Sequence, residues 1–314
     1  MHCLQSVSVE RLLRTQLAAG PNGAQAVIDK PHSSSPFLPM SPKEIMRSGD
    51  YNHEVSLLLG YNKDEGLLHT GAAYKNPALV NQWRSKWLET FGPSTLLGLK
   101  DQPIDSPSRE ITRKIAEHYL DSIDAMTFDN ISNITNMYTD SWFGHPVHDF
   151  VSRRISNKQK TFYQNSTFQY RFTHQGQSSL SMFLGQGGPY GDNHADELFL
   201  IFSPFAGQPL VLNDQDKQMS DILLSLWKSF IKTGKPSTEK ITWDPILGAS
   251  SRQYLNLNLQ PIMEYPDKIK QNMEFWDKIV TEVENQKKRQ ENNAARKVPQ
   301  NIIFICTIMH LFST

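Results

Sequence analysis

The stretch EVSLLLGYNKDEG, residues 54–66, indicates the fold class because a short apolar run leads directly into a turn rich in glycine and charge. Val55 to Leu59 have the length of one buried strand, and Gly60 ends the run. Further along, FQYRFTH (168–174) alternates aromatic and polar side chains, which is typical of a second strand with two unlike faces. Because helical patterns alternate with these strands, we predict an α/β fold.

Three helices have recognisable ends in the sequence. One starts near Ser106, where a proline and then an apolar stripe follow. A second, with a stronger apolar stripe, follows NDQDK (213–217) and ends at Gly234. The last starts near Lys268 and ends near Val283, with one apolar and one charged side.

The composition changes after Val283. The segment ENQKKRQENNAARK (284–297) is charged and lacks aromatic residues, so we expect it to be disordered. The apolar run NIIFICTIMHLF (301–312) is too short to span a bilayer, and we interpret it as a processed tail or an unstructured end. One domain over residues 1–283 is therefore expected, followed by a linker and short tail over 284–314.

Charge and cysteine content exclude several classes of function. With 32 basic and 32 acidic residues the net charge is +0, so no global field attracts nucleic acid, and no nucleic-acid partner is expected. Cys3 and Cys306 are the two cysteines of the chain and provide neither a disulfide framework nor a metal-ligand cluster. The first twenty residues do not have the pattern of a signal peptide. Three glycosylation acceptors nevertheless favour a secreted glycoprotein: Asn130, Asn133 and Asn165.

Two charged turns provide the candidate chemistry. Glu65 lies in the turn after the first strand, and His194 lies in the loop GDNHADELF (191–199), just after a glycine-rich stretch. In nucleophilic catalysis without a cofactor, a carboxylate orients an imidazole, which removes a proton from serine. In α/β hydrolases the chain order is nucleophile, acid, histidine, and Glu65 and His194 keep that order. The flanking carboxylates are interpreted as solvated or loop-fixing: Asp64, Asp192, Asp196 and Glu197.

A metal site is the weaker alternative. His145 and His148 in WFGHPVHDF (142–150) have helical i, i+3 spacing with Asp149 beside them. We predict no metal there, because Pro146 interrupts a helical pattern and no Cys or Glu cluster accompanies the pair. A polar histidine at the start of a helix is the favoured interpretation.

Several segments in the right order resemble the type-B carboxylesterase and cholinesterase family. They are FLPMSPKEIMRSGDY (37–51), LLLGYNKDEG (57–66), GDNHADELFLIF (191–202) and NMEFWDKIV (272–280). The resemblance covers roughly residues 1–283 and implies the C-terminal part of an α/β-hydrolase fold, with a mixed or parallel sheet flanked by helices. It also implies that Glu65 is the triad acid, that His194 is the triad base, and that a small carboxylic ester is the substrate. Members of this family sometimes dimerise through C-terminal helices, so the last helix could serve either dimerisation or internal packing.

The sequence departs from that family at the nucleophile. No G-x-S-x-G pentapeptide occurs in the 314 residues, and the nearest strings, GQSSL (176–180) and GASSR (248–252), lack the second glycine and follow Glu65. The His-Gly-Gly oxyanion loop of the family is missing as well. The segment HCLQSVSVERLL (2–13) resembles one that follows a small disulfide loop past the nucleophile, which would make Cys3 the second cysteine of that loop.

We therefore expect the C-terminal part of a serine esterase, inactive alone. One alternative is an adhesion or interaction protein that uses the same fold without catalysis. Another is a truncated product whose exposed sheet edges prevent stable folding. Retention of both Glu65 and His194 favours an enzyme as the parent protein.

Overall fold

The computed structural model describes residues 6–18, 28–29, 35–52, 54–96, 106–158, 166–202, 210–248 and 253–297. The chain forms two compact units, Met1–Asn52 and His53–Thr314. The first unit carries helices α2 (Val9–Ala18) and α3 (Pro42–Ser48). Ser41 and Glu44 form a capping box at the start of α3, and Gly49 ends it in the left-handed conformation.

The second unit contains the sheet and most of the helices. Its strands are β1 (Leu57–Asn62), β2 (Thr167–Phe172), β3 (Tyr254–Leu257) and β4 (Ile262–Glu264). Between β1 and β2 lie α4 (Leu67–Thr70), η1 (Gly71–Tyr74), α5 (Ala78–Ser85), η2 (Trp87–Leu96), α6 (Ser106–Leu120), η3 (Phe128–Asn130), α7 (Ile131–Thr139), η4 (Asp140–Gly144) and α8 (His145–Lys158). After β2 come α9 (Leu180–Phe183), η5 (Asp196–Leu200), α10 (Asp214–Thr233) and, after β4, α11 (Asp267–Lys297).

The four strands form one mixed sheet in the order β1-β2-β3-β4. β1 pairs in parallel with β2 and β2 with β3, whereas β3 and β4 form an antiparallel hairpin. Leu58 lies opposite Phe168 in the parallel register, and Asn62 lies opposite Phe172. Because β1 and β2 run in the same direction, their carboxyl ends meet at one edge of the sheet. The predicted mixed sheet flanked by helices is confirmed.

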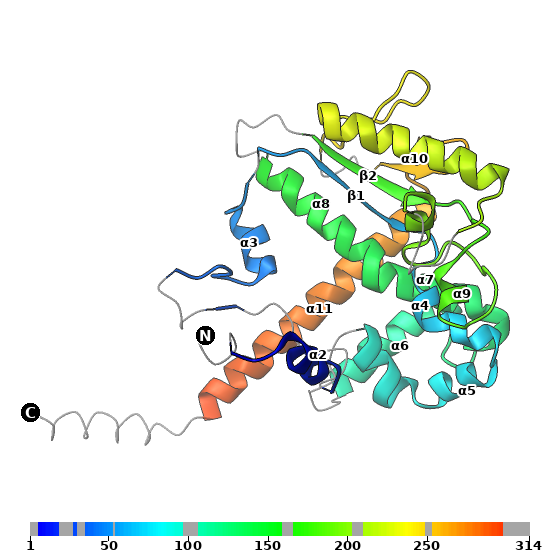
Figure 1. Ribbon diagram of the computed structural model, residues 1–314. Helices are drawn as coiled ribbons and strands as arrows, with labels where there is room; N and C mark the ends of the chain where they lie inside the picture. The colour runs from blue at the N-terminus through cyan, green and yellow to red at the C-terminus, as the bar shows by residue number, and fades with distance from the viewer. Residues whose placement is uncertain are drawn as a thin grey trace, which may run out of the picture. The chain divides into compact units, whose positions relative to one another are not determined.

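Helices cover both faces of this sheet (Figure 1). On one face, Phe168 and Phe172 of β2 pack with Met219, Leu223 and Leu226 of α10 in a buried cluster. On the other face, Leu59 of β1 packs against Val151 and Ile155 of α8. The polar residues of β2 are covered too, since Gln169 is buried, so the expected polar face of this strand is not a solvent face.

A separate apolar core joins the helices that follow β1. Its buried members come from α5, η2, α6, α7 and α11, including Trp83, Ile115, Ile134, Tyr138 and Trp276. This core fixes α7 beside α4 and therefore supports the turn that follows β1.

Two predicted helices agree closely with the structure. α6 buries Ile111 and Ile115, as the stripe after Ser106 predicted. α10 begins after the Asn213 cap, whose side chain accepts a hydrogen bond from the Asp216 amide, and ends at Gly234 in the left-handed conformation.

Three local predictions are wrong. β1 runs over Leu57–Asn62 instead of Val55 to Leu59, and Gly60 lies within the strand because its backbone pairs with β2 there. Pro146 does not interrupt a helix: it lies in the first turn of α8, which follows the π-helix η4 without a break.

The third wrong prediction concerns the end of the last helix. α11 continues through Lys297, so residues 284–297 are helical and not disordered. Glu, Lys, Arg, Gln and Ala are good helix formers, and they extend a helix whose first turns are anchored in the core. The predicted tail at 301–314 lies outside the described residues. No helix in the described part of the chain is both long and apolar enough to cross a bilayer.

Candidate active site

Glu65 lies in the tight turn that follows β1, with both carboxylate oxygens engaged. Its Oε1 accepts a hydrogen bond from the Asn62 amide over 2.8 Å, and its Oε2 lies 2.7 Å from Nδ1 of His194. The next residue, Gly66, packs so closely on α7 that a Cβ would collide with the Thr135 carbonyl oxygen. The turn thus needs glycine at this position and presents the Glu65 carboxylate toward His194.

The Glu65–His194 contact joins residues 129 positions apart in the sequence. The Glu65 side chain is 5% exposed and that of His194 is 42% exposed, so a buried carboxylate faces a partly open imidazole. The hydrogen bond to Glu65 is the main cause that raises the pKa of His194, and burial acts in the opposite direction. With Glu65 ionised, Nδ1–H is the donor, which leaves Nε2 as the nitrogen able to accept a proton.

A network of buried polar groups fixes the backbone on either side of His194. The Asn193 amide donates to Asp196 Oδ2 over 2.9 Å, and the Asn193 side chain donates to the Ser181 hydroxyl over 2.9 Å. Asp196 also accepts the Leu180 amide through its other oxygen. Burial raises the pKa of Asp196 to about 7 despite these hydrogen bonds. Hydrogen bonds to Leu180 and Ser181 of α9, together with the bond between Asn193 and Asp196 inside the loop, therefore hold the loop in place.

Ala195 directly after His194 has a φ of 62°, in the left-handed region that favours glycine. Only one other non-glycine residue of the described chain, Asp121, has a positive φ. A strained residue next to a candidate base is a common feature of functional loops.

Asn62 connects the two candidate loops from the end of β1. Its buried side-chain amide donates to the Asn193 carbonyl over 2.7 Å and to Glu197 Oε2 over 2.6 Å. Burial raises the pKa of Glu197, while the hydrogen bond from Asn62 lowers it. Asn62 therefore contacts the loop of Glu65 through its backbone and the loop of His194 through its side chain.

The flanking carboxylates fix the loops, which is one of the two roles predicted for them, and three of the four are largely buried. Asp192 and Asp196 are buried, and Glu197 is bound to Asn62. Asp64 accepts a hydrogen bond from the Asp192 amide. The residues that sequence reasoning missed are Asn62, Asn193 and Ser181, because short polar side chains near turns give no signal of burial in a single sequence.

His145 and His148 lie in the first turn of α8. His145 Nε2 lies 3.0 Å from Asp277 Oδ1, and the two imidazole rings are 6.5 Å apart. No group of three or more His, Cys, Asp or Glu side chains arranged for a metal occurs in the described part of the chain.

The modification candidates differ in their surroundings. Asn133 is exposed on α7, whereas the side-chain amide of Asn130 donates to the Ala125 carbonyl over 2.8 Å. Asn165 and Cys3 lie outside the described residues.

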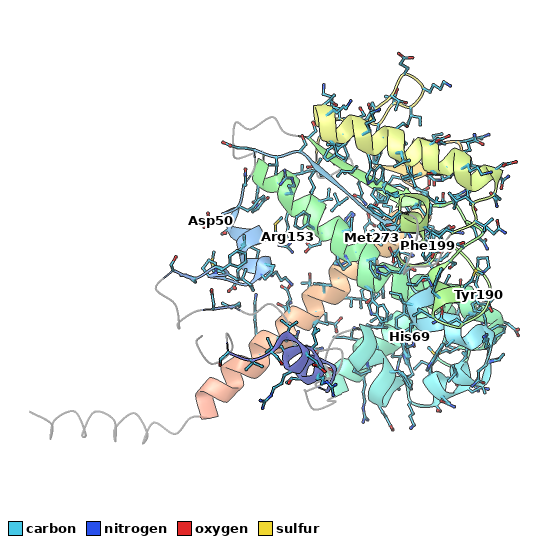
Figure 2. The ribbon with its side chains drawn as sticks, viewed as in Figure 1. Asp50, His69, Arg153, Tyr190, Phe199 and Met273 are labelled. Atoms are coloured by element: carbon cyan, nitrogen blue, oxygen red, sulfur yellow. The ribbon has the colours of Figure 1, made fainter. Side chains whose placement is uncertain are left out.

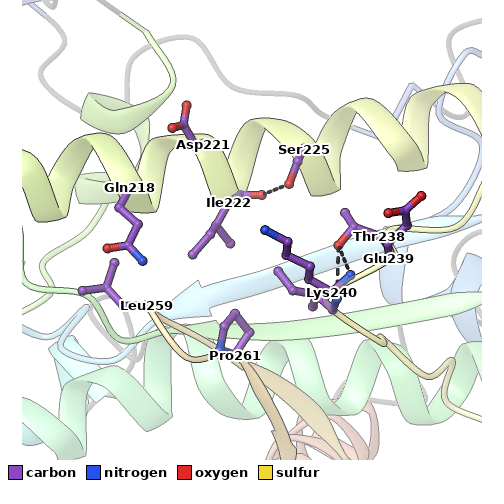
Figure 3. Close-up of a pocket in the computed structure, with 10 residues that line it drawn as sticks. Gln218, Asp221, Ile222, Ser225, Thr238, Glu239, Lys240, Leu259 and Pro261 are labelled. Carbon is purple, nitrogen blue, oxygen red and sulfur yellow. Dashed lines mark hydrogen bonds between the residues drawn. The ribbon is translucent and has the colours of Figure 1, made fainter.

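A groove of about 640 Å³ lies away from this site, between α10 and the segments that flank β3 and β4 (Figure 3). Its lining includes the apolar residues Ile222, Ile241 and Leu259. The Lys240 side chain extends along the groove. Neither Glu65 nor His194 lines this groove.

Comparison with known proteins agrees with the fold. The family model described as "Carboxylesterase family" matches residues 1–276. The chain belongs to the carboxylesterase family. Among its relatives are a carboxylic ester hydrolase of Bombus ignitus, 28% identical over 81% of this chain and 44% of the relative, and venom carboxylesterase-6 of Apis mellifera, 24% identical over 79% and 43%. An acylcarnitine hydrolase of Rattus norvegicus is 25% identical over 83% of this chain and 42% of its own length.

The fold is that of the α/β hydrolases. The crystal structure of juvenile hormone esterase from Manduca sexta, with OTFP covalently attached, superposes with a TM-score of 0.64 at 18% identity. The superposition covers 89% of this carboxylesterase-family chain and 52% of the juvenile hormone esterase chain. The chain thus spans about half the length of the proteins it matches.

Proposed function

We propose that the chain provides the acid and the base of a serine carboxylic ester hydrolase. The observation that carries the proposal is the 2.7 Å contact between Glu65 Oε2 and His194 Nδ1, with the carboxylate buried and the imidazole partly exposed. Membership of the carboxylesterase family supports the reaction class, and a small-molecule carboxylic ester is the proposed substrate.

In the proposed reaction His194 Nε2 takes the proton of a serine hydroxyl as its oxygen attacks the ester carbonyl carbon. Glu65 keeps Nδ1 protonated and stabilises the imidazolium that forms. His194 then gives the proton to the departing alcohol, which leaves an acyl-enzyme. Water repeats the sequence with His194 again as base, releasing the acid and restoring the serine.

The serine is proposed to come from protein outside these 314 residues, because the sequence contains no G-x-S-x-G pentapeptide. Without that serine and the oxyanion donors the chain alone has no nucleophile, and loss of even one donor costs roughly 3 kcal/mol of transition-state stabilisation. We expect negligible hydrolysis of p-nitrophenyl butyrate by the 314-residue chain.

The decisive experiment uses the product of the complete transcript that contains this sequence. Its kcat/KM for p-nitrophenyl butyrate is measured beside Glu65→Gln and His194→Gln, with His174→Gln as a matched control. His174 belongs to a second buried pair, 2.9 Å from Asp216, so its loss changes packing without touching Glu65 or His194. Both site variants should lose at least about 10⁴-fold in kcat/KM. Full activity in either variant would contradict the role proposed for that residue. A complete product with no serine elbow and no activity would favour the interaction-protein alternative.

A secreted, glycosylated parent is also proposed. The sequons support it, and one relative is named a venom carboxylesterase. Cys3 as a disulfide partner and a dimer through α11 remain predictions.

A further inference from the structure

Asp64 and Asp192 join the two loops that carry Glu65 and His194. The Asp64 amide donates to the Asp192 carbonyl over 3.0 Å, and the Asp192 amide donates to Asp64 Oδ2 over 3.1 Å. Asp64 directly precedes Glu65, and Asp192 lies two residues before His194. These reciprocal bonds therefore close a ring at the place where the candidate acid and base meet.

The glycine next to Asp192 is required by this contact. A Cβ at Gly191 would collide with Asp64 Oδ2. The loop can therefore approach Asp64 only because residue 191 has no side chain.

The carboxyl group of Asp192 lies in an unfavourable place for a charge. The residue is 2% exposed, and its Oδ1 has no hydrogen-bond partner among the described residues. Burial first, and the neighbouring charge of Asp64 second, raise the pKa of Asp192 to about 7. Lys63 and Arg171 also face Asp192 and lower its pKa. Asp196 is a further acidic group that interacts with it.

We propose that Asp64 and Asp192 are positioning residues: they hold Glu65 against His194 while the Asp192 carboxyl is protonated, and release the two loops when it ionises. The proposal rests on the proposed function of Glu65 and His194. An ionised Asp192 repels the Asp64 carboxylate and needs water at its unpartnered oxygen. Both effects favour separation of the loops, which would break the two reciprocal hydrogen bonds.

The sign follows from linkage. A folded-state pKa above the ordinary aspartate value means that the folded chain binds more protons than the unfolded chain between pH 4 and 7, approximately. Stability and loop closure should therefore fall as the pH rises through about 7. Asn at position 192 mimics the protonated acid and should remove this dependence.

The test is an NMR titration of the full 314-residue chain with ¹⁵N-labelled histidine, in which His194→Gln assigns the resonance. The Nδ1–H proton of His194 should be protected from exchange at pH 6 and lost as the pH rises through about 7. In Asp192→Asn it should remain protected as the pH rises through about 7. Asp64→Asn keeps an acceptor for the Asp192 amide but removes a charge that raises the pKa of Asp192, so the transition should move to lower pH. In Asp64→Ala the Nδ1–H proton of His194 should be lost to exchange at every pH.

The controls separate this proposal from the function on which it rests. Asp221→Asn removes an exposed carboxylate of α10 and should follow the wild-type profile. If Asp192→Asn also follows that profile, the positioning role is wrong, even where Glu65→Gln and His194→Gln inactivate the complete enzyme. If those two variants stay active, the function is wrong whatever the titration shows. Should a variant not fold, the ¹³C shift of the wild-type Asp192 carboxyl decides: a midpoint below about 5 overturns the proposal.

Discussion

The Gly66 amide donates a hydrogen bond to the Thr139 hydroxyl over 2.9 Å, which ties the turn of Glu65 to the end of α7. Both groups are buried, so the amide has no water to replace this partner. The helical core around α7 therefore supports the candidate acid.

Replacing Thr139 by Val should destabilise the fold by about 1–3 kcal/mol, because a buried amide loses its acceptor while the side-chain volume is kept. Thr139→Ser retains the hydroxyl and should lose less. Urea unfolding measures both, and equal losses in the two variants would contradict the assignment of the bond.

Removal of the Glu65 charge should lower the pKa of His194. The hydrogen bond to Glu65 is the largest cause of its raised pKa, so Glu65→Gln removes the main contribution. Because the folded-state pKa is raised, this pair stabilises the fold below the ordinary histidine pKa and loses the contribution as the pH rises through the raised value. A ¹⁵N titration of His194 checks the direction, and an unchanged midpoint in Glu65→Gln would show that another group sets it.

His69 should destabilise the fold in acid. His69 lies among the helices of the second unit (Figure 2). Its ring contacts those of Trp83, Tyr138 and Trp142. Its Nε2 is buried with no hydrogen-bond partner among the described residues, and burial lowers the pKa of His69 to about 4. Between the ordinary histidine pKa and about 4, only the unfolded chain takes up the proton. The free energy of unfolding therefore decreases as the pH is lowered, by up to about 1.4 kcal/mol per pH unit.

His69→Phe should flatten this acid slope, which unfolding curves between pH 4.5 and 7 would show. His118→Gln is the comparison: burial lowers the pKa of His118 as well, but its hydrogen bond to Asn272 opposes this, so His118→Gln should flatten the slope less. A slope in His69→Phe that equals the wild-type slope would mean that His69 is protonated in the fold.

Glycine at position 195 should relieve backbone strain beside His194. Ala195 and Asp121 have nearly the same positive φ, and a left-handed alanine costs roughly 1–2 kcal/mol, partly offset by the greater entropy of unfolded glycine. Ala195→Gly and Asp121→Gly should each stabilise the fold by up to about 1 kcal/mol. Of the two, Ala195→Gly alone should alter exchange of the His194 Nδ1 proton.

Neighbouring leucines on α10 test the sheet-facing core. Leu223 is fully buried against β2, whereas Leu224 is 46% exposed. Leu223→Ala should cost about 2–5 kcal/mol and Leu224→Ala less than about 1 kcal/mol. Similar losses would place α10 in a different rotation about its axis.

Glycosylation should favour Asn133. It is exposed on α7, while the amide of Asn130 is bound to the Ala125 carbonyl. When the chain is secreted from eukaryotic cells, Asn133→Gln should remove more glycan mass than Asn130→Gln. The measurement is the shift in gel mobility of each protein after glycosidase treatment. No shift in wild type would contradict glycosylation of either asparagine.

Periodic patterns in the sequence predicted α6, α10 and β2, because burial of one stripe decides those elements. They did not predict the length of α11, where helix propensity continues after the apolar stripe ends. The pairing of Glu65 with His194 was predicted from motif resemblance, and the structure brings the two side chains into contact. The support from Asn62, Asn193 and Ser181 depends on contacts across more than ten residues, which no local pattern records.

In the sheet that the described residues form, β1 is one of the two edge strands, and Glu65 follows its last residue by three positions. A parallel strand added beside β1 would therefore place its own carboxyl end next to the candidate acid. The acid and base therefore lie beside this edge, so a single pairing event there could both extend the sheet and bring a new loop to His194.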